Sequence, residues 1–149
     1  MKWTGEARRQ TDEDELEPDD PVARVMEVAR DVCSAHELYL HVASDRRIDD
    51  DLLSNVAGYM WACKYGLALF ETLVEDNLNR NVLIEVGSML MTGRRCELLR
   101  DETAPPMPTD LIGQIRTDVD FSDLSAVRDR IHVWIAEDLG LGRCEDCPR

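Results

Sequence analysis

The sequence has no apolar run close to the ~20 residues that a membrane-spanning helix needs, and its opening stretch MKWTGEARRQ lacks the apolar segment of a signal peptide. Positive charge is also scarce, since 17 Lys and Arg against 31 Asp and Glu give a formal net charge of -14 at pH 7. Such an acidic surface repels nucleic-acid phosphates and anionic lipid headgroups. We therefore expect a cytoplasmic protein whose partner is neither a nucleic acid nor a membrane.

The sequence also lacks the glycine motifs that bind phosphate, because neither a P-loop nor a GxGxxG pattern occurs. Its five cysteines are an odd number, and Cys33, Cys63 and Cys96 each fall inside an apolar periodic segment. A reduced cysteine in such a segment behaves as a small buried hydrophobe. This pattern argues against a disulfide framework.

The remaining cysteines, Cys144 and Cys147, form a CxxC pair in the tail CEDCPR. Structural zinc takes about four nitrogen or sulfur ligands, and no second pair with finger-like spacing is present. The histidines His36, His41 and His132 are far apart in sequence, so we predict that each is solvated or hydrogen-bonded rather than a ligand. We predict no metal site, no resident cofactor and a solvated tail, with a metal shared by two such tails in a dimer as the alternative.

The 149 residues are the usual size of one domain. Residues 1–20 hold eight acidic residues with little apolar periodicity, which is typical of a disordered acidic leader. Residues 21–140 show helix and strand periodicity, and residues 141–149 form the CxxC tail. The sequence therefore predicts one domain between two short terminal segments.

Helices and strands alternate along residues 21–140. Asp20 and Pro21 are an N-cap and first helical residue, and apolar positions then recur at helical spacing. The run LYLHVAS alternates like a strand, and GLALF is continuously apolar like a strand buried on both faces. The predicted elements are helix 21–36, strand 38–42, helix 49–63, strand 66–70, helix 81–93, strand 96–99, strand 115–119 and helix 122–139.

This alternation with short connections predicts an α/β fold with a doubly wound, mostly parallel sheet of the flavodoxin-like or TIR-like kind. A doubly wound domain normally opens with a strand, and residues 1–20 contain nothing that reads as one. We therefore expect a domain truncated at its N-terminus, a strand supplied by a partner, or a leader that pairs against its propensity.

A narrow polar stripe runs along the predicted helix 81–93. Glu85 is its only charged residue, and Asn81, Glu85, Ser88 and Thr92 recur at helical spacing on an otherwise apolar segment. Either the stripe is the solvent-facing edge of a packed helix, or it lines a cleft. In a cleft, a carboxylate near the helix start would stabilise the oxocarbenium-like centre that develops as a glycosidic bond breaks.

Two segments carry a family resemblance: NRNVLIEVGSMLMTGRR, and after it CELLRDETAPPMPTDLIGQI. Together with the upstream run YMWACKYGLALFE, they make residues 38–139 resemble the TIR-like nucleotide-binding domains of bacteria, which are related in architecture to nucleoside deoxyribosyltransferases. The resemblance lies in an N-x-N-V-x-x-E-x-G helix start followed by a P-T-D-L-x-G segment. It implies a nucleotide ligand such as NAD or a cyclic nucleotide signal.

The resemblance assigns roles to residues of these motifs. Glu85 matches the glutamate used in NAD cleavage or deoxyribosyl transfer, and Asn79 and Asn81 would shape the entry to its helix. Gly87 would let a ligand approach closely because it has no side chain. Asp110 would touch a ligand hydroxyl, or simply cap a turn.

Asp45 and Arg46 follow the first predicted strand, where ligands bind in open α/β sheets, so they would contact phosphate or ribose. The alternative for this pair is a solvated charged loop. For the whole chain, the expected function is binding of a nucleotide with cleavage of the N-glycosidic bond of NAD. The alternatives are deoxyribosyl transfer between nucleobases, and a non-catalytic module that assembles with itself or with a larger effector chain.

Overall fold

The computed structural model describes residues 20–42, 52–71, 80–104 and 116–148. In this part of the chain a parallel sheet of three strands, in the order β1-β2-β3, forms the centre. The strands are β1 (Tyr65–Phe70), β2 (Arg95–Asp101) and β3 (Arg116–Val119). The predicted α/β fold with a mostly parallel sheet is confirmed.

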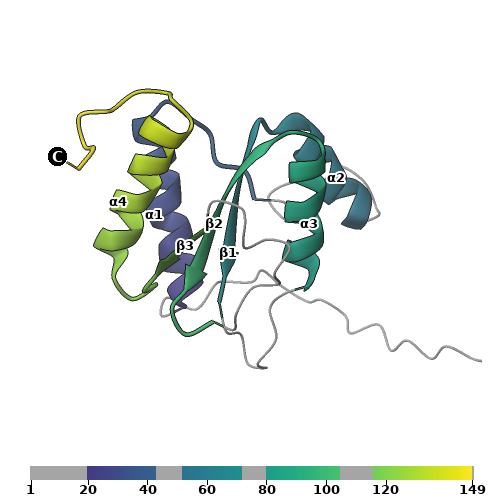
Figure 1. Cartoon of the computed structure of the whole chain (residues 1–149), viewed down its shortest axis with the longest axis horizontal. Helices are drawn as coiled ribbons and strands as arrows, with labels where there is room; N and C mark the ends of the chain where they lie inside the picture. Colours follow the sequence, from purple (N-terminus) through teal and green to yellow (C-terminus); the bar gives the residue numbers. More distant parts are fainter. Residues whose placement is uncertain (1–19, 43–51, 72–79, 105–115, 149) are drawn as a thin grey trace, which may run out of the picture.

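Helices cover both faces of the sheet (Figure 1). They are α1 (Pro21–Ala35), α2 (Leu52–Ala62), α3 (Arg80–Met91) and α4 (Leu124–Val133), which the π-helix η2 (Trp134–Asp138) extends. Helices α1 and α4 pack together on one face, and α2 and α3 lie on the other. No helix of the described segments is both long and apolar enough to cross a membrane.

The helix starts follow from side chains that cap the first free N–H groups. The carboxylate of Asp20 accepts a hydrogen bond from the Val22 N–H at 2.9 Å, and Pro21 occupies the first helical position of α1. Asp123 caps α4 in the same way, accepting from the N–H of Ser125 at 3.1 Å and of Ala126 at 3.0 Å. Each cap satisfies donors that have no partner within their own helix, as the sequence predicted.

Two apolar layers form because successive strand residues point to opposite faces. Leu99 of β2 is buried with α1 and α4, and Leu69 of β1 packs against the same layer. Leu98 and Ala68, each one position earlier, are buried against α3 on the other face. Strands β1 and β2 therefore contribute to both layers, which explains why their segments are apolar with little alternation.

The predicted strand after the first helix is wrong, because residues 38–42 form no strand. Helix α1 ends in a turn that needs a left-handed residue, here Glu37 with φ 58°, and the Leu38 N–H donates back to the Cys33 carbonyl at 2.8 Å. Beyond this turn Leu38 and Leu40 pack against the apolar layer of α1 and α4. The alternation in the sequence therefore corresponds to one apolar face of this segment.

A buried ion pair lies between the sheet and α4. The side chain of Glu97, in the middle of β2, is 0% exposed. Arg130 of α4 donates two hydrogen bonds to its carboxylate, at 2.7 and 3.0 Å, and a third to Asp138 of η2 at 2.9 Å. The hydroxyl of Thr117 in β3 donates to the same carboxylate at 3.0 Å. The Arg130 guanidinium thus links β2, α4 and η2.

We expect Glu97→Gln to lower the free energy of unfolding by about 2–3 kcal/mol, because Arg130 would lose one partner charge in a desolvated place. The matched control is Asp118→Asn, which removes a bidentate pair with Arg100 at the surface (2.8 and 3.0 Å) and should cost less than about 1 kcal/mol. Urea unfolding of the two variants measures both values. Equal losses would show that burial does not strengthen the Glu97 pair.

Candidate functional site

The carboxyl ends of the strands are the place to look for a ligand site, because ligands of open α/β sheets bind there. A link of three residues, 92–94, joins α3 to β2, so α3 runs antiparallel to the strand. Its first turns therefore lie toward the carboxyl edge of the sheet (Figure 1). This places Glu85, in the second turn of α3, near that edge.

The Glu85 side chain is half-buried, and loss of solvent raises its pKa above the ordinary value of 4.5. Burial is the one cause of this shift, so no positive charge among the described residues offsets it. A carboxylate held in this way gains stability when a cation arrives. The resemblance assigned roles to several residues. Among them, Glu85 is the one whose described surroundings support a chemical role.

Two further residues of the polar stripe, Ser88 and Thr92, bond to the backbone of α3 and line a small hollow. The Ser88 hydroxyl donates to the Ile84 carbonyl at 2.9 Å, and the Thr92 hydroxyl donates to the Ser88 carbonyl at 3.0 Å. Both residues also line a hollow of about 80 Å³ against α2, which Trp61 and Arg94 help to close. This hollow is too small for a nucleotide, so Ser88 and Thr92 act as packing residues with satisfied hydroxyls.

Most other predicted site residues cannot be placed. Asp45, Arg46, Asn79 and Asp110 lie outside the described residues, as does the side chain of Asn81. At Gly87 an added Cβ would meet no atom within 4 Å, so its surroundings leave open space beside α3. The structure therefore brings Glu85 and Gly87 onto one helix without testing the rest of the proposed pocket.

Acidic groups also gather at the ends of β1 and β2. Burial raises the pKa of Glu71, and the nearby charges of Asp20 and Asp101 raise it further. Asp20 is the cap of α1, and Asp101 accepts hydrogen bonds from the N–H of Phe121 at 2.9 Å and of Thr103 at 3.3 Å. Asp20 thus caps a helix and Asp101 stabilises a turn, whereas Glu71 has no such role among the described residues.

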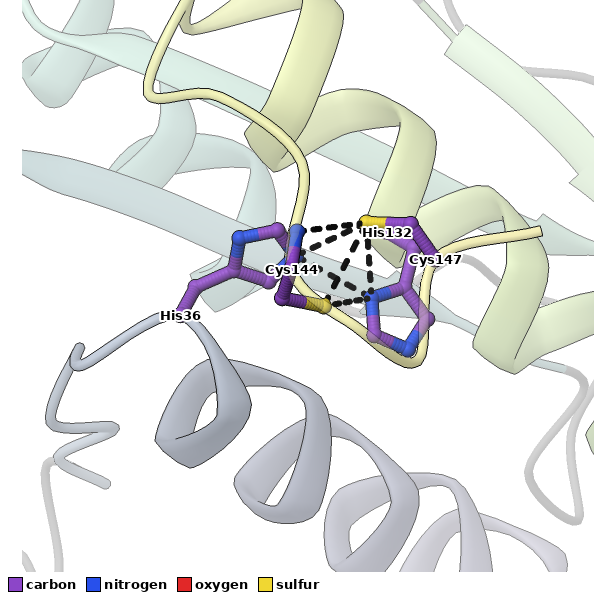
Figure 2. Close-up of side chains that lie close together, drawn as sticks. All are labelled: His36, His132, Cys144 and Cys147. Carbon is purple, nitrogen blue, oxygen red and sulfur yellow. Dashed lines mark hydrogen bonds between the residues drawn. The ribbon is translucent and has the colours of Figure 1, made fainter. Parts of the chain in front are cut away.

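A second group of side chains lies at the opposite edge of the sheet (Figure 2). The ligand-type atoms of His36, His132, Cys144 and Cys147 all lie within 4.8 Å of one another. His36 Nε2 is 3.0 Å from His132 Nδ1, and the two Sγ atoms are 3.3 Å apart. His132 Nδ1 lies 3.4 Å from Cys144 Sγ and 3.7 Å from Cys147 Sγ, which is itself 3.6 Å from His36 Nε2.

Burial lowers the pKa of both imidazoles in this group. For His132 the neighbouring His36 lowers the pKa further, whereas a hydrogen bond with the Gly142 backbone opposes the shift of His36. The direction of both shifts favours the neutral imidazole, which is the form that binds a metal ion. His132 Nε2, which points away from the other three side chains, has no hydrogen-bond partner in the described structure.

The sequence prediction for these residues is incomplete. His36 and His132 were expected to be solvated or hydrogen-bonded, and they lie at hydrogen-bond distance from one another, with His132 buried. The CxxC pair was recognised as a ligand motif without finding its partners. The missing signal is tertiary, because only the packing of α1 on α4 brings the two histidines to the tail.

The two tryptophans also differ. Trp134 is buried with its ring edge-on to Tyr65, at 6.5 Å between centroids, as expected for a packing residue. Trp61 is 70% exposed, with the Arg94 guanidinium 5.0 Å from the ring centroid.

Comparison with known proteins gives no match to a protein family, to a curated protein or to a solved structure. The TIR-like resemblance therefore stays a prediction. The arguments that follow rest on the geometry of this chain.

We expect Glu85→Gln to be more stable than the wild type at pH 7. A raised pKa means that the charged form of Glu85 weakens folding, and this penalty is present above the pKa of the folded state. As the pH falls below the ordinary value of 4.5, both states carry the neutral acid and the difference between the proteins disappears. Thermal unfolding from pH 3.5 to 8 would measure it, and a constant difference would contradict burial as the cause.

Proposed function

We propose that this chain is a nucleotide-binding domain of TIR-like architecture that cleaves the N-glycosidic bond of NAD through Glu85. The observation that carries the proposal is the half-buried carboxylate of Glu85, with its raised pKa, on the helix that follows β1. That helix begins at the edge of a parallel sheet where nucleotides bind in α/β domains.

The chemistry of NAD suits a carboxylate that has lost solvent. The nicotinamide ring is cationic, so its approach would compensate the desolvated negative charge of Glu85 and lower its pKa again. As the bond between nicotinamide and ribose breaks, the positive charge moves to the anomeric carbon. A carboxylate fixed beside that carbon stabilises the charge where it develops.

The reaction balances with water alone. NAD and water give nicotinamide, ADP-ribose and a proton, and the ring leaves as a neutral molecule with both bonding electrons. Because the leaving group is neutral, no acid has to protonate it. A single carboxylate is therefore a sufficient catalytic group for bond cleavage.

The test is incubation of the purified protein with NAD at high protein concentration, with free nicotinamide followed by chromatography over hours. We expect release by the wild type and a fall of about 100-fold or more in Glu85→Gln, because the transition state would lose its charge partner. Glu27→Gln is the matched control, since Glu27 is an exposed glutamate on α1, across the sheet from α3. It should keep full activity.

Other outcomes separate the alternatives. Release of free base from deoxynucleosides without any reaction of NAD would favour deoxyribosyl transfer, again through Glu85. No release by either protein, with both shown to be folded by circular dichroism, would contradict catalysis.

An assembly role has its own structural support. In the described sheet β1 is an edge strand, and three large apolar side chains are exposed on the helices of one face: Trp61 on α2, and Ile84 and Met91 on α3. Exposed apolar groups near an open strand edge favour association with another chain. If the wild-type protein releases no nicotinamide, light scattering should show oligomers if assembly is its function. A stable monomer would argue against assembly.

A further inference from the structure

We propose that His36, His132, Cys144 and Cys147 bind one zinc ion per chain, which fastens the C-terminal segment to the ends of α1 and α4. The proposal is independent of Glu85, because α4 begins just after the carboxyl end of β3 and so carries His132 to the opposite edge of the sheet. It rests on the arrangement of the four side chains in Figure 2.

The distances match a tetrahedral site. Zinc binds sulfur at about 2.3 Å and imidazole nitrogen at about 2.0–2.1 Å, so neighbouring ligand atoms in a tetrahedron stand about 3.3–3.8 Å apart. The two Sγ atoms are 3.3 Å apart, three of the four sulfur to nitrogen distances are 3.4, 3.6 and 3.7 Å, and all four ligand atoms lie within 4.8 Å of one another. The nitrogens of His36 and His132 are 3.0 Å apart and need to separate by only a few tenths of an ångström.

The chemistry of the group also calls for a cation. Two imidazole nitrogens and two sulfurs lie within 4.8 Å of one another, and all four are atom types that bind zinc. The Cys144 N–H donates to Cys147 Sγ at 3.1 Å, so a backbone hydrogen bond holds this sulfur beside the other three ligand atoms. A divalent ion would satisfy all four atoms at once and would offset the charge of two thiolates.

Local structure holds each ligand in place before any ion arrives. His36 is the C-cap of α1, and its imidazole hydrogen bonds with the Gly142 backbone. His132 lies in the last turn of α4 and is 0% exposed. The hydrogen bond of His36 to the Gly142 backbone fixes the direction of its ring, and burial restricts the ring of His132.

The tail reaches this place through two sharp turns. Gly140 and Gly142 have φ values of 70° and 89°, which residues with a Cβ rarely adopt, and they bring the chain from η2 back to the helix ends. Cys144 and Cys147 then face each other across a turn in which the Cys147 N–H donates to the Cys144 carbonyl at 3.3 Å. The cysteines are thus placed by backbone geometry rather than by a long flexible arm.

The ligand set selects the metal and its role. Two sulfurs and two imidazoles in a tetrahedron favour zinc over calcium or magnesium, which prefer oxygen ligands. A cluster of two irons would hold the cysteines and the histidines on separate metal ions, whereas here all four ligand atoms lie within 4.8 Å of one another, close enough for one ion. Four protein ligands complete the zinc shell, so the ion would be structural rather than catalytic.

The first experiment measures zinc bound to purified, reduced protein by elemental analysis, and then the absorption of the chain reloaded with Co²⁺. We expect one zinc per chain, and a cobalt spectrum with intense tetrahedral bands and a sulfur charge-transfer band. Cys144→Ser/Cys147→Ser and His36→Gln should each lose stoichiometric zinc and the tetrahedral cobalt bands.

Matched controls replace the same residue types elsewhere. Cys63→Ser changes a half-buried cysteine on the far side of the sheet, and His41→Gln changes an exposed histidine, so both should keep one zinc per chain. Retention of zinc by the Cys144→Ser/Cys147→Ser protein would overturn the proposal. So would one zinc per two chains, because the ion would then be shared between tails.

Removal of zinc from the wild type gives a test that does not depend on whether a variant folds. A chelator should lower the melting temperature by about 5 °C or more, and added zinc should restore it, because an ion that binds only the folded chain stabilises it. The Cys144→Ser/Cys147→Ser protein should not respond to either treatment. Reduced wild-type protein that neither takes up zinc nor shifts its melting temperature, or that readily forms a Cys144–Cys147 disulfide in excess zinc, would contradict the proposal.

Discussion

The guanidinium of Arg130 sets how α4 and the chain after it lie on the sheet. It holds the buried carboxylate of Glu97 on one side and Asp138, at the end of η2, on the other. Since Glu97 is fixed in the middle of β2, the rotation of α4 about its own axis is fixed as well. Two residues further along the helix, His132 then faces α1 and not the sheet. A single buried pair therefore determines which side of α4 meets the neighbouring helix.

This constraint gives the molecule two edges with different chemistry. At the carboxyl edge, Asp20 caps a helix and Asp101 stabilises a turn. The desolvated Glu85 at the same edge has no opposite charge from the described residues. At the amino edge, groups distant in sequence meet, since α1, α4 and the tail each contribute to the cluster of His36, His132, Cys144 and Cys147. Carboxylates at one edge favour a cationic ligand, and neutral imidazoles with sulfurs at the other favour a soft metal ion.

The sequence predicted those structural features that depend on residues close together in the chain, such as helix starts and strand segments. Asp20 and Asp123 mark helix starts because a cap acts within three residues, and apolar runs mark the strands. Leu38 and Leu40 misled because alternation shows which side is buried and says nothing about pairing. The helical stripe identified Glu85 as unusual, but its desolvation depends on tertiary packing. The histidines could not be joined to the CxxC pair, because 96 positions separate His36 from His132 and only helix packing brings them together.

A zinc ion at the amino edge would stabilise the position of the C-terminal segment in a domain of this size. The described sheet has three strands, so the apolar layer beneath α1 and α4 is narrow, and small cores leave little free energy to order a terminal segment. The tail after η2 is largely exposed and polar, and apolar burial alone would not hold it. Zinc coordination would replace the missing burial with bonds to two helix ends. It would also hold η2 in place, so that Asp138 remains beside Arg130 and the pair with Glu97 stays shielded from water.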